Sequence, residues 1–239
     1  MSLYRDEGIV LRTYRLGEAD RIVVILTRAH GKVRAVAKGV RKTKSRFGAR
    51  LEPTSHTALL MYEGRGELQV VSQADAIDQF RSIRDDLDRF SRASAMLEAV
   101  DQLAQERQPD TRLYTMLLGA LRALAARNAP LVLPGFFWKL LAHEGFQPVV
   151  DACVTCGAGE RLVAFDLEEG GVLCETDRRG TPLSERAIDL LRLILGGQLG
   201  AALNEHQSPA TEEVEHLATR AMEHHLERRL RSVSLLDLG

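Results

Sequence analysis

The sequence predicts an α+β protein in which a small N-terminal β-barrel precedes an all-helical domain that is interrupted by a cysteine-containing insert. Over roughly the first 75 residues, short apolar runs alternate with polar residues and are separated by turn sequences. From about residue 83 the apolar residues recur every three to four positions, which is the helical period. Between residues 146 and 180 this helical pattern stops, and all three cysteines of the chain lie there.

Five short strands are expected in the N-terminal region. They are rich in Val, Ile, Leu and Thr, and turn sequences such as His30-Gly31 separate them. The expected strands span residues 8–14, 21–27, 32–38, 56–62 and 67–72. Five strands with one longer connection after the third match a small closed barrel of the OB type, although an SH3-like barrel would give a similar pattern.

Helices are expected in most of the remaining chain. One lies near residues 86–107 and has an inward-facing Leu87 at its start, and a second begins after Asp110, a candidate N-cap. A third, shorter helix ends at Gly145. No run approaches the roughly 20 apolar residues that a membrane span needs, so we expect no membrane association.

Two further helices are expected after the insert. Ser184 can cap the first of them, and Ser208 followed by Pro209 can begin the last, near residues 209–231. The predicted domain boundaries are 1–80 for the barrel, 81–147 for the first helical part, 148–180 for the insert and 181–239 for the second helical part.

Positive charge is concentrated near the N-terminus. The first fifty residues hold thirteen Lys/Arg against four Asp/Glu, a balance of +9, whereas the remainder holds nineteen against twenty-nine, a balance of -10. Between residues 28 and 50 there are nine cations and no acid. Such a block repels itself unless a polyanion or counterions neutralise it.

The segment from Gly39 to Arg50 combines cations, hydroxyl groups and glycines, a mixture suited to phosphate contacts. The residues expected to bind nucleic acid are Arg34, Lys38, Arg41, Lys42, Lys44, Arg46, Phe47 and Arg50. Phe47, Tyr14 or Tyr62 could stack on a base, but aromatic residues make up only 5% of the chain. Contact with the backbone should therefore dominate, without sequence preference. A solvated basic loop, a mononucleotide site or an acidic protein partner are the alternatives.

The cysteines form a pattern typical of a metal site. Cys153 and Cys156 make a C-x-x-C knuckle, and the Gly157 that follows permits a tight turn. Cys174 comes after a spacer of the length found in four-thiolate zinc sites, and Asp177 stands where the fourth cysteine would be. Carboxylate oxygen is a zinc ligand, so we expect these four side chains to hold one structural Zn²⁺ per chain.

Other arrangements of the insert remain open. Glu175, His143 or a water molecule are weaker candidates for the fourth ligand, and the simpler alternative is a set of free buried thiols. The odd number of cysteines favours a reducing compartment and a metal over disulfides, which predicts a cytoplasmic protein.

No enzyme motif accompanies these features. The chain has no phosphate-binding G-x-x-x-x-G-K-[ST], no H-E-x-x-H and no G-x-S-x-G. The basic segment also lacks the clustered acids that a metal-dependent nuclease would need. We therefore expect a protein that is not an enzyme.

Several motifs together resemble those of the RecO family of bacterial DNA repair proteins. They are Gly8-Ile9-Val10-Leu11, Gly17-Glu18-Ala19-Asp20-Arg21, Gly31-Lys32, Ala37-Lys38-Gly39 with Arg41, Ser45-Arg46-Phe47 and Leu51-Glu52-Pro53. The likeness continues through the helical middle and the knuckle, and it departs from the four-cysteine form of the family at Asp177. The resemblance implies a five-stranded OB-fold barrel followed by an all-helical domain with a zinc-finger-like insert.

The resemblance also implies a function. Such a protein would bind single- and double-stranded DNA, anneal complementary strands, and act with RecR and single-stranded-DNA-binding protein to load recombinase, with RecF as a further candidate partner. It would work in the cytoplasm, associated with the nucleoid. The rival hypotheses are an RNA-binding or ribosome-associated zinc protein, a scaffold that docks an acidic partner, and a nuclease.

Overall fold

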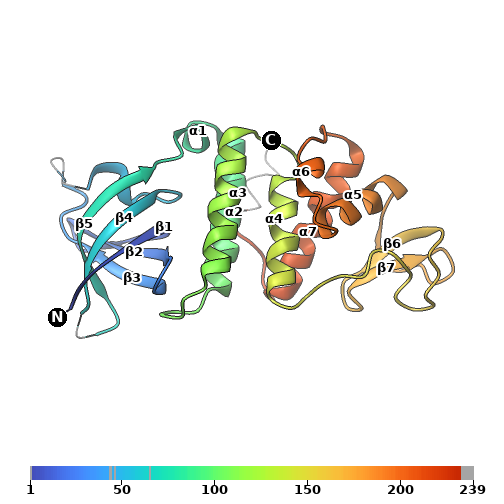
Figure 1. Ribbon diagram of the computed structural model, residues 1–239, viewed down its shortest axis with the longest axis horizontal. Helices are drawn as coiled ribbons and strands as arrows, with labels where there is room; N and C mark the ends of the chain where they lie inside the picture. The colour runs from blue at the N-terminus through green and yellow to red at the C-terminus, as the bar shows by residue number, and fades with distance from the viewer. Residues whose placement is uncertain (1, 43–44, 46, 65, 233–239) are drawn as a thin grey trace. The chain divides into compact units, whose positions relative to one another are not determined.

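The computed structural model describes residues 2–42, 45, 47–64 and 66–232 (Figure 1). The chain packs as two compact units, the first formed by Met1–Ala126 with Arg231–Gly239 and the second by Arg127–Leu230. The four domains expected from the sequence were drawn by type of secondary structure, and these two units were drawn by packing. The four-domain division remains a prediction. Among the helices that the structure describes, none is long and apolar enough to cross a membrane.

The first unit begins with a closed five-stranded barrel. Its strands are β1 (Leu3–Leu16), β2 (Asp20–Thr27), β3 (Gly31–Ala37), β4 (His56–Tyr62) and β5 (Gln69–Asp78), joined in the order β1-β2-β3-β5-β4. The pairing of β3 with β5 is parallel and the other pairings are antiparallel. This order and the single parallel pair identify an OB fold rather than an SH3-like barrel.

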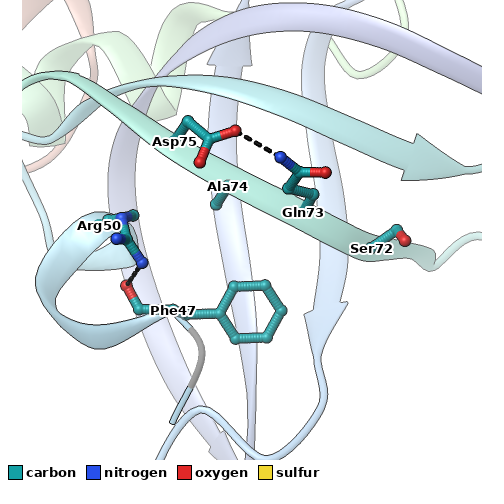
Figure 2. Close-up of a pocket in the computed structure, with 6 residues that line it drawn as sticks. All are labelled: Phe47, Arg50, Ser72, Gln73, Ala74 and Asp75. Carbon is teal, nitrogen blue, oxygen red and sulfur yellow. Dashed lines mark hydrogen bonds between the residues drawn. The ribbon is translucent and has the colours of Figure 1, made fainter.

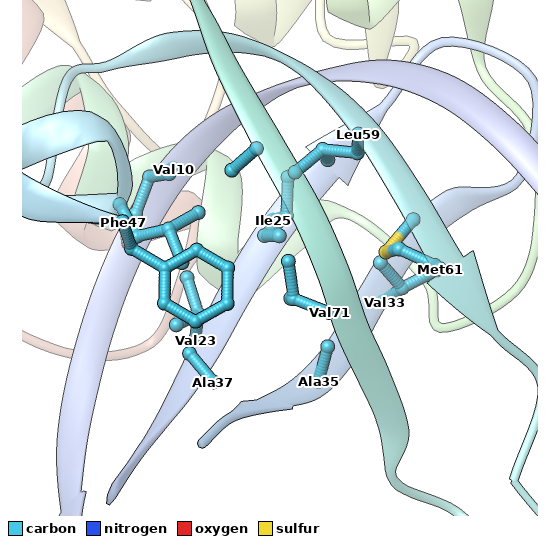
Figure 3. Close-up of a cluster of buried hydrophobic side chains, with 12 residues drawn as sticks. Val10, Val23, Ile25, Val33, Ala35, Ala37, Phe47, Leu59, Met61 and Val71 are labelled. Atoms are coloured by element: carbon cyan, nitrogen blue, oxygen red, sulfur yellow. The ribbon is translucent and has the colours of Figure 1, made fainter. Parts of the chain in front are cut away.

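The barrel closes because alternate residues of every strand point inward. On β3, for example, Val33, Ala35 and Ala37 are buried, while the residues between them are partly exposed. The inward side chains form one apolar core (Figure 3), made of Val10, Val23, Ile25, Val33, Ala35, Ala37, Phe47, Leu51, Leu59, Met61, Val71 and Ala74. A core of this kind holds the outward side chains on a rigid scaffold.

Two strands are longer than the sequence predicts. β1 begins at Leu3 instead of residue 8, because it pairs with β4 from Leu3↔Tyr62 to Ile9↔His56 and so holds a charged segment in extended form. β5 runs on to Asp78, where it pairs with His56. Pairing with β4 therefore sets the start of β1 and the end of β5, and the local amino-acid composition does not reveal this pairing.

The helices of the first unit are α1 (Arg81–Arg84), α2 (Leu87–Leu103) and α3 (Thr111–Ala126). Asp110 caps α3 as expected, since its Oδ1 accepts from the N–H of Leu113 at 2.8 Å. The inward placement of Leu87 is wrong, because this first helical residue is 77% exposed.

Helix α2 also ends earlier than predicted, at Leu103. The chain leaves the helix to bridge β3, where the N–H of Arg107 donates to the carbonyl of Lys32 at 2.9 Å. The approach is close: a Cβ on Gly31 would lie 2.0 Å from the carbonyl oxygen of Gln108. Gly31 therefore allows both its turn, at φ +69°, and this contact.

The second unit contains α4 (Val132–His143), α5 (Glu185–Leu195), α6 (Leu199–Ala202) and α7 (Pro209–His225). Ser184 caps α5 and Ser208 forms a capping box at the start of α7, which confirms both predicted helix starts. Helix α7 ends at His225, six residues before the predicted end near residue 231.

The insert lies between α4 and α5. It contains a small sheet, ordered β7-β6-β8, formed by β6 (Leu162–Asp166), β7 (Gly171–Cys174) and β8 (Thr181–Pro182). Its apolar anchor is Phe165, whose ring centroid is 5.8 Å from that of Trp138 on α4. The sheet also buries Leu162, Ala164, Val172 and Leu173, so the buried apolar side chains of the insert lie mainly on β6 and β7.

Candidate nucleic-acid interface and metal site

A group of cations lies at the end of β3 beside the turn between β1 and β2. The backbone N–H of Arg41 donates to the carbonyl of Ala19 at 3.0 Å, and its guanidinium donates to the carbonyl of Glu18 at 2.8 Å. The N–H of Gly39 donates to Asp20 Oδ1 at 2.7 Å. These bonds fix the segment after β3 against the neighbouring turn, so its cations have a defined place.

The charges in this group are open to solvent. Lys38, Arg41 and Lys42 are exposed, and within the described residues none of them forms an ion pair with an acid. Arg34 lies on the same outward face of β3, four residues before Lys38. Its guanidinium Nη1 is 3.8 Å from Oε2 of the mostly exposed Glu67. The structure thus brings four of the predicted residues onto β3 and the segment that follows it.

Arg50 lies in the short helix η1 (Gly48–Leu51), beside a pocket of about 470 Å³. Strands β3 and β5 pair only at Ala35↔Gln69 and Val36↔Val70, and the pocket adjoins β5 just beyond this pairing. It is lined by Phe47, Arg50, Ser72, Gln73, Ala74 and Asp75 (Figure 2). Arg50 brings one cation to this polar pocket and donates to the carbonyl of Phe47 at 3.4 Å.

Phe47 requires a correction. We expected its ring to stack on a base, but the side chain is fully buried and belongs to the barrel core (Figure 3). A ring with no exposed face cannot stack on a nucleotide, so Phe47 is a packing residue. Two other predicted contacts, Lys44 and Arg46, lie outside the described residues.

Two N-terminal cations, Arg12 and Lys32, contact helix α2. Arg12 is 2.6 Å from the buried carboxylate of Asp101 on α2, and Lys32 lies 3.6 Å from the same side chain. Lys32 also donates to the backbone carbonyl of Asp101 at 2.5 Å. These contacts attach α2 to the barrel, so part of the positive charge counted in the sequence is neutralised inside the first unit.

The predicted metal ligands meet in the second unit. One ligand atom from each of Cys153, Cys156, Cys174 and Asp177 lies within 4.8 Å of the others. The sulfurs of Cys156 and Cys174 are 3.7 Å apart, and Asp177 Oδ2 lies 3.3 Å from Cys153 and 3.4 Å from Cys174. Neither Glu175 nor His143 belongs to this cluster among the residues that the structure describes.

The three short distances are close to the edges of a tetrahedral metal site. With zinc–sulfur bonds near 2.3 Å and zinc–oxygen bonds near 2.1 Å, the edges of a tetrahedron are about 3.8 Å between sulfurs and about 3.6 Å between sulfur and oxygen. The donor set of three thiolates and a carboxylate is also one that zinc accepts. The four side chains could therefore hold a metal ion.

The backbone favours negative charge at Cys153, whereas the hydrogen bond to Asp177 raises the pKa of the Cys156 thiol to about 12. Burial raises the pKa of the Cys153 thiol, but hydrogen bonds from the N–H groups of Cys156, Cys174 and Thr155 outweigh burial and lower this pKa. The knuckle turns at Gly157, which has φ +76° and donates to the carbonyl of Cys153 at 2.8 Å. The turn thus supplies donors to a thiolate, as the sequence pattern predicts.

One residue of the site was missed by sequence reasoning. Arg179 donates to Asp166 Oδ2 at 2.9 Å, to Thr155 Oγ1 at 3.3 Å, and to Glu169. It also donates to the carbonyl of Asp177 at 3.4 Å. Arg179 thus connects the knuckle, the β6–β7 turn and the loop that carries Asp177, and no motif in the sequence distinguishes it from its neighbour Arg178.

Models of one protein family match nearly the whole chain. The family model described as Recombination protein O N terminal matches residues 1–80, and the model described as Recombination protein O C terminal matches residues 84–234. The two matches together cover nearly the full sequence.

Curated relatives carry the name DNA repair protein RecO. One from Frankia casuarinae is 43% identical over 243 residues, covering 99% of both chains. One from Bifidobacterium longum is 44% identical over 246 residues, covering 99% of this chain and 100% of the relative. A third, from Nocardioides sp., is 41% identical over 245 residues, covering 98% of this chain and 99% of the relative. The chain therefore belongs to the RecO family of DNA repair proteins.

Proposed function

We propose that this protein is a recombination mediator that binds single- and double-stranded DNA without sequence preference and catalyses no reaction itself. The observation that carries the proposal is the group of exposed cations formed by Lys38, Arg41 and Lys42, fixed at one end of a rigid barrel. Cations on a rigid surface can contact phosphates in a fixed register without reading base edges.

Strand annealing follows from the same chemistry. Two complementary strands repel each other through their phosphates, and bound cations reduce that repulsion. Contacts that do not involve Watson–Crick edges leave those edges free to pair. The barrel would therefore speed annealing without a catalytic residue.

The partners are proposed from family membership. We propose RecR as the partner in recombinase loading, single-stranded-DNA-binding protein as the protein that presents the strand, and RecF as a further partner. This work would take place in the cytoplasm at the nucleoid.

For the insert we propose one structural Zn²⁺, held by Cys153, Cys156, Cys174 and Asp177. The ion would be structural, because a four-coordinate protein site leaves no position open for a substrate. It would cross-link the two segments that carry its ligands. A metal assay on freshly purified, unchelated protein should find about one zinc per chain, and a result near zero would contradict this assignment.

The DNA proposal is tested by fluorescence anisotropy with labelled single- and double-stranded oligonucleotides of several sequences at several salt concentrations. The affinity should vary little with sequence and should fall with salt. For single strands the expected slope of log K against log salt is about -0.7 per phosphate contacted. An absence of binding at low salt would contradict the proposal and would favour a scaffold that binds an acidic protein.

Two further measurements separate the rival functions. Complementary labelled strands should anneal faster with the protein than without it, and both should remain intact with magnesium or manganese. In competition, an RNA of equal length should not displace DNA preferentially. Cleavage would indicate a nuclease, and strong RNA preference would indicate an RNA-binding protein.

A further inference from the structure

One edge of strand β5 has no strand partner over most of its length. Strand β3 ends at Ala37 and pairs with β5 only through Gln69 and Val70, whereas β5 continues to Asp78. Helix η1 lies beside this part of β5, but among the described residues no backbone hydrogen bond joins the two elements. In a strand that is paired on one side, every second residue turns its N–H and C=O groups to the other side. This part of β5 therefore presents unpaired backbone donors and acceptors.

The neighbouring edge of β3 is covered. A bridge joins Lys32 to Glu106, and the N–H of Arg107 donates to the carbonyl of Lys32, so the α2–α3 loop lies along that edge. Proteins usually cover strand edges in this way, because an open edge pairs with other chains. On β5, the register with β4 shifts on either side of Gln73–Ala76. These residues, which we call the β5 edge, form a short open edge that is bounded by two bulges.

A pocket adjoins the β5 edge (Figure 2). Its volume is about 470 Å³, and three of the residues that line it, Gln73, Ala74 and Asp75, belong to the edge itself. Arg50 of η1 stands on the other side of the pocket. Successive side chains of a strand point to opposite faces, so a chain that pairs with the β5 edge would place one of its side chains in the pocket.

The pocket contains one cation and one carboxylate that are not paired with each other. Arg50 donates to the carbonyl of Phe47 at 3.4 Å, and Asp75 Oδ2 accepts from Gln73 Nε2 at 2.6 Å. No hydrogen bond links Arg50 to Asp75 in Figure 2. A guanidinium can only donate and a carboxylate can only accept, so a group that both donates and accepts is complementary to the pair. The carboxamide of Gln or Asn is such a group, and Gln73 already shows its contact with Asp75.

We propose that the β5 edge binds an extended segment of a partner protein, which adds as a further strand and places a Gln or Asn side chain in the pocket against Arg50 and Asp75. In this mode of recognition the main-chain hydrogen bonds supply affinity, and the pocket supplies specificity. The site uses none of the three cations that carry the DNA proposal, Lys38, Arg41 and Lys42. The inference therefore goes beyond DNA binding and does not depend on it.

Two other occupants fit the site less well. A nucleic acid has no row of alternating N–H and C=O groups to pair with the edge, and the carboxylate of Asp75 offsets the attraction of Arg50 for a phosphate. A second copy of the chain would pair the β5 edge with its own counterpart. Such a contact through four residues from each copy is far smaller than the roughly 1,200–2,000 Å² of a stable interface, and it would leave both pockets unfilled.

The test is a nuclear magnetic resonance titration of the full-length, ¹⁵N-labelled protein with blocked pentapeptides at millimolar concentrations. The first probe is acetyl-Thr-Val-Gln-Val-Thr-amide. It should shift the amide signals of Gln73–Ala76 and slow their hydrogen exchange. A probe with Leu in place of Gln should bind about tenfold more weakly or worse, because Asp75 and Arg50 lose their hydrogen-bond partner. A probe with N-methylated Val residues should not bind, because it cannot complete the strand pairing.

Two variants separate the pocket from the edge. Asp75→Ala should bind the Gln and Leu probes equally, whereas Glu63→Ala, which removes another exposed acid of the barrel, should keep the preference for Gln. Equal binding of the N-methylated probe, or the lack of any shift at Gln73–Ala76, would contradict strand addition. Displacement of the Gln probe by single-stranded DNA would identify a nucleic-acid site instead. A dimer in sedimentation that the Gln probe dissociates would identify a second copy as the occupant. Affinity for DNA at low salt, measured separately, tests the proposed function and is unaffected by these outcomes.

Discussion

The barrel and the insert fix their functional side chains in opposite ways. The barrel has a closed apolar core, and its cations stand outside that core on segments that pairing and backbone hydrogen bonds already hold. In the insert, the candidate ligands and Arg179 are themselves the links between loops. We therefore expect substitutions in the barrel's surface to change binding alone, whereas substitutions in the cluster should change folding.

The largest effect should come from removing a thiolate. In Cys174→Ala the cluster loses a ligand, and since metal binding can contribute about 10 kcal/mol to folding, the insert should unfold. Trp138 is the single tryptophan of the chain and contacts Phe165 of the insert, so its fluorescence should shift to longer wavelength. DNA binding by the barrel should be retained.

The matched control for that variant is Glu175→Gln. Glu175 is exposed and adjacent to Cys174 but lies outside the cluster. The zinc content and tryptophan emission of Glu175→Gln should therefore equal those of the wild type. Wild-type emission from Cys174→Ala with no metal bound would show that the insert folds without the ion.

The next effect in size concerns the barrel core. Phe47→Ala should lower the free energy of unfolding of the first unit by about 3–5 kcal/mol, because it deletes a fully buried ring. The measurement is denaturant unfolding followed by far-ultraviolet circular dichroism. If Phe47→Ala instead unfolds like the wild type and binds single-stranded DNA more weakly, the ring contacts bases and its assignment to the core is wrong.

A smaller effect is expected from Arg179→Ala. Residues that orient metal ligands typically change metal affinity by about tenfold to a hundredfold, and Arg179 contacts the carbonyl of Asp177 and the knuckle residue Thr155. Competition with a zinc chelator measures the affinity, with Arg178→Ala as the control for removal of one neighbouring cation. Equal affinities for the two variants would remove Arg179 from the site.

The differences between prediction and structure have the same cause in both regions. Local signals were reliable where the physics is local: Asp110, Ser184 and Ser208 cap helices as expected, and the C-x-x-C spacing forms its turn. Contacts between distant segments were not visible. Phe47 stands within a basic segment of the sequence, yet it completes the barrel core, because only the closed barrel creates the space that it fills.

The candidate sites show the same limit. Spacing alone predicted the cysteine and aspartate cluster, since its ligands come from two short segments with a known separation. Charge counting predicted the basic end of the barrel, but it could not separate Lys38, which is open to solvent, from Arg12, which pairs with Asp101 on α2.

The central claim is that the exposed cations after β3 bind phosphates. It is tested by measuring single-stranded DNA affinity against salt for Lys38→Glu/Lys42→Glu beside Arg112→Glu/Lys139→Glu, which makes the same change in charge at exposed positions on α3 and α4. We predict that the first variant binds all sequences more weakly and has a salt slope shallower by about 0.7 for each phosphate that it no longer binds, while the second stays close to wild type. Equal affinities and slopes for the two variants would contradict the claim and place the DNA-binding surface elsewhere on the chain.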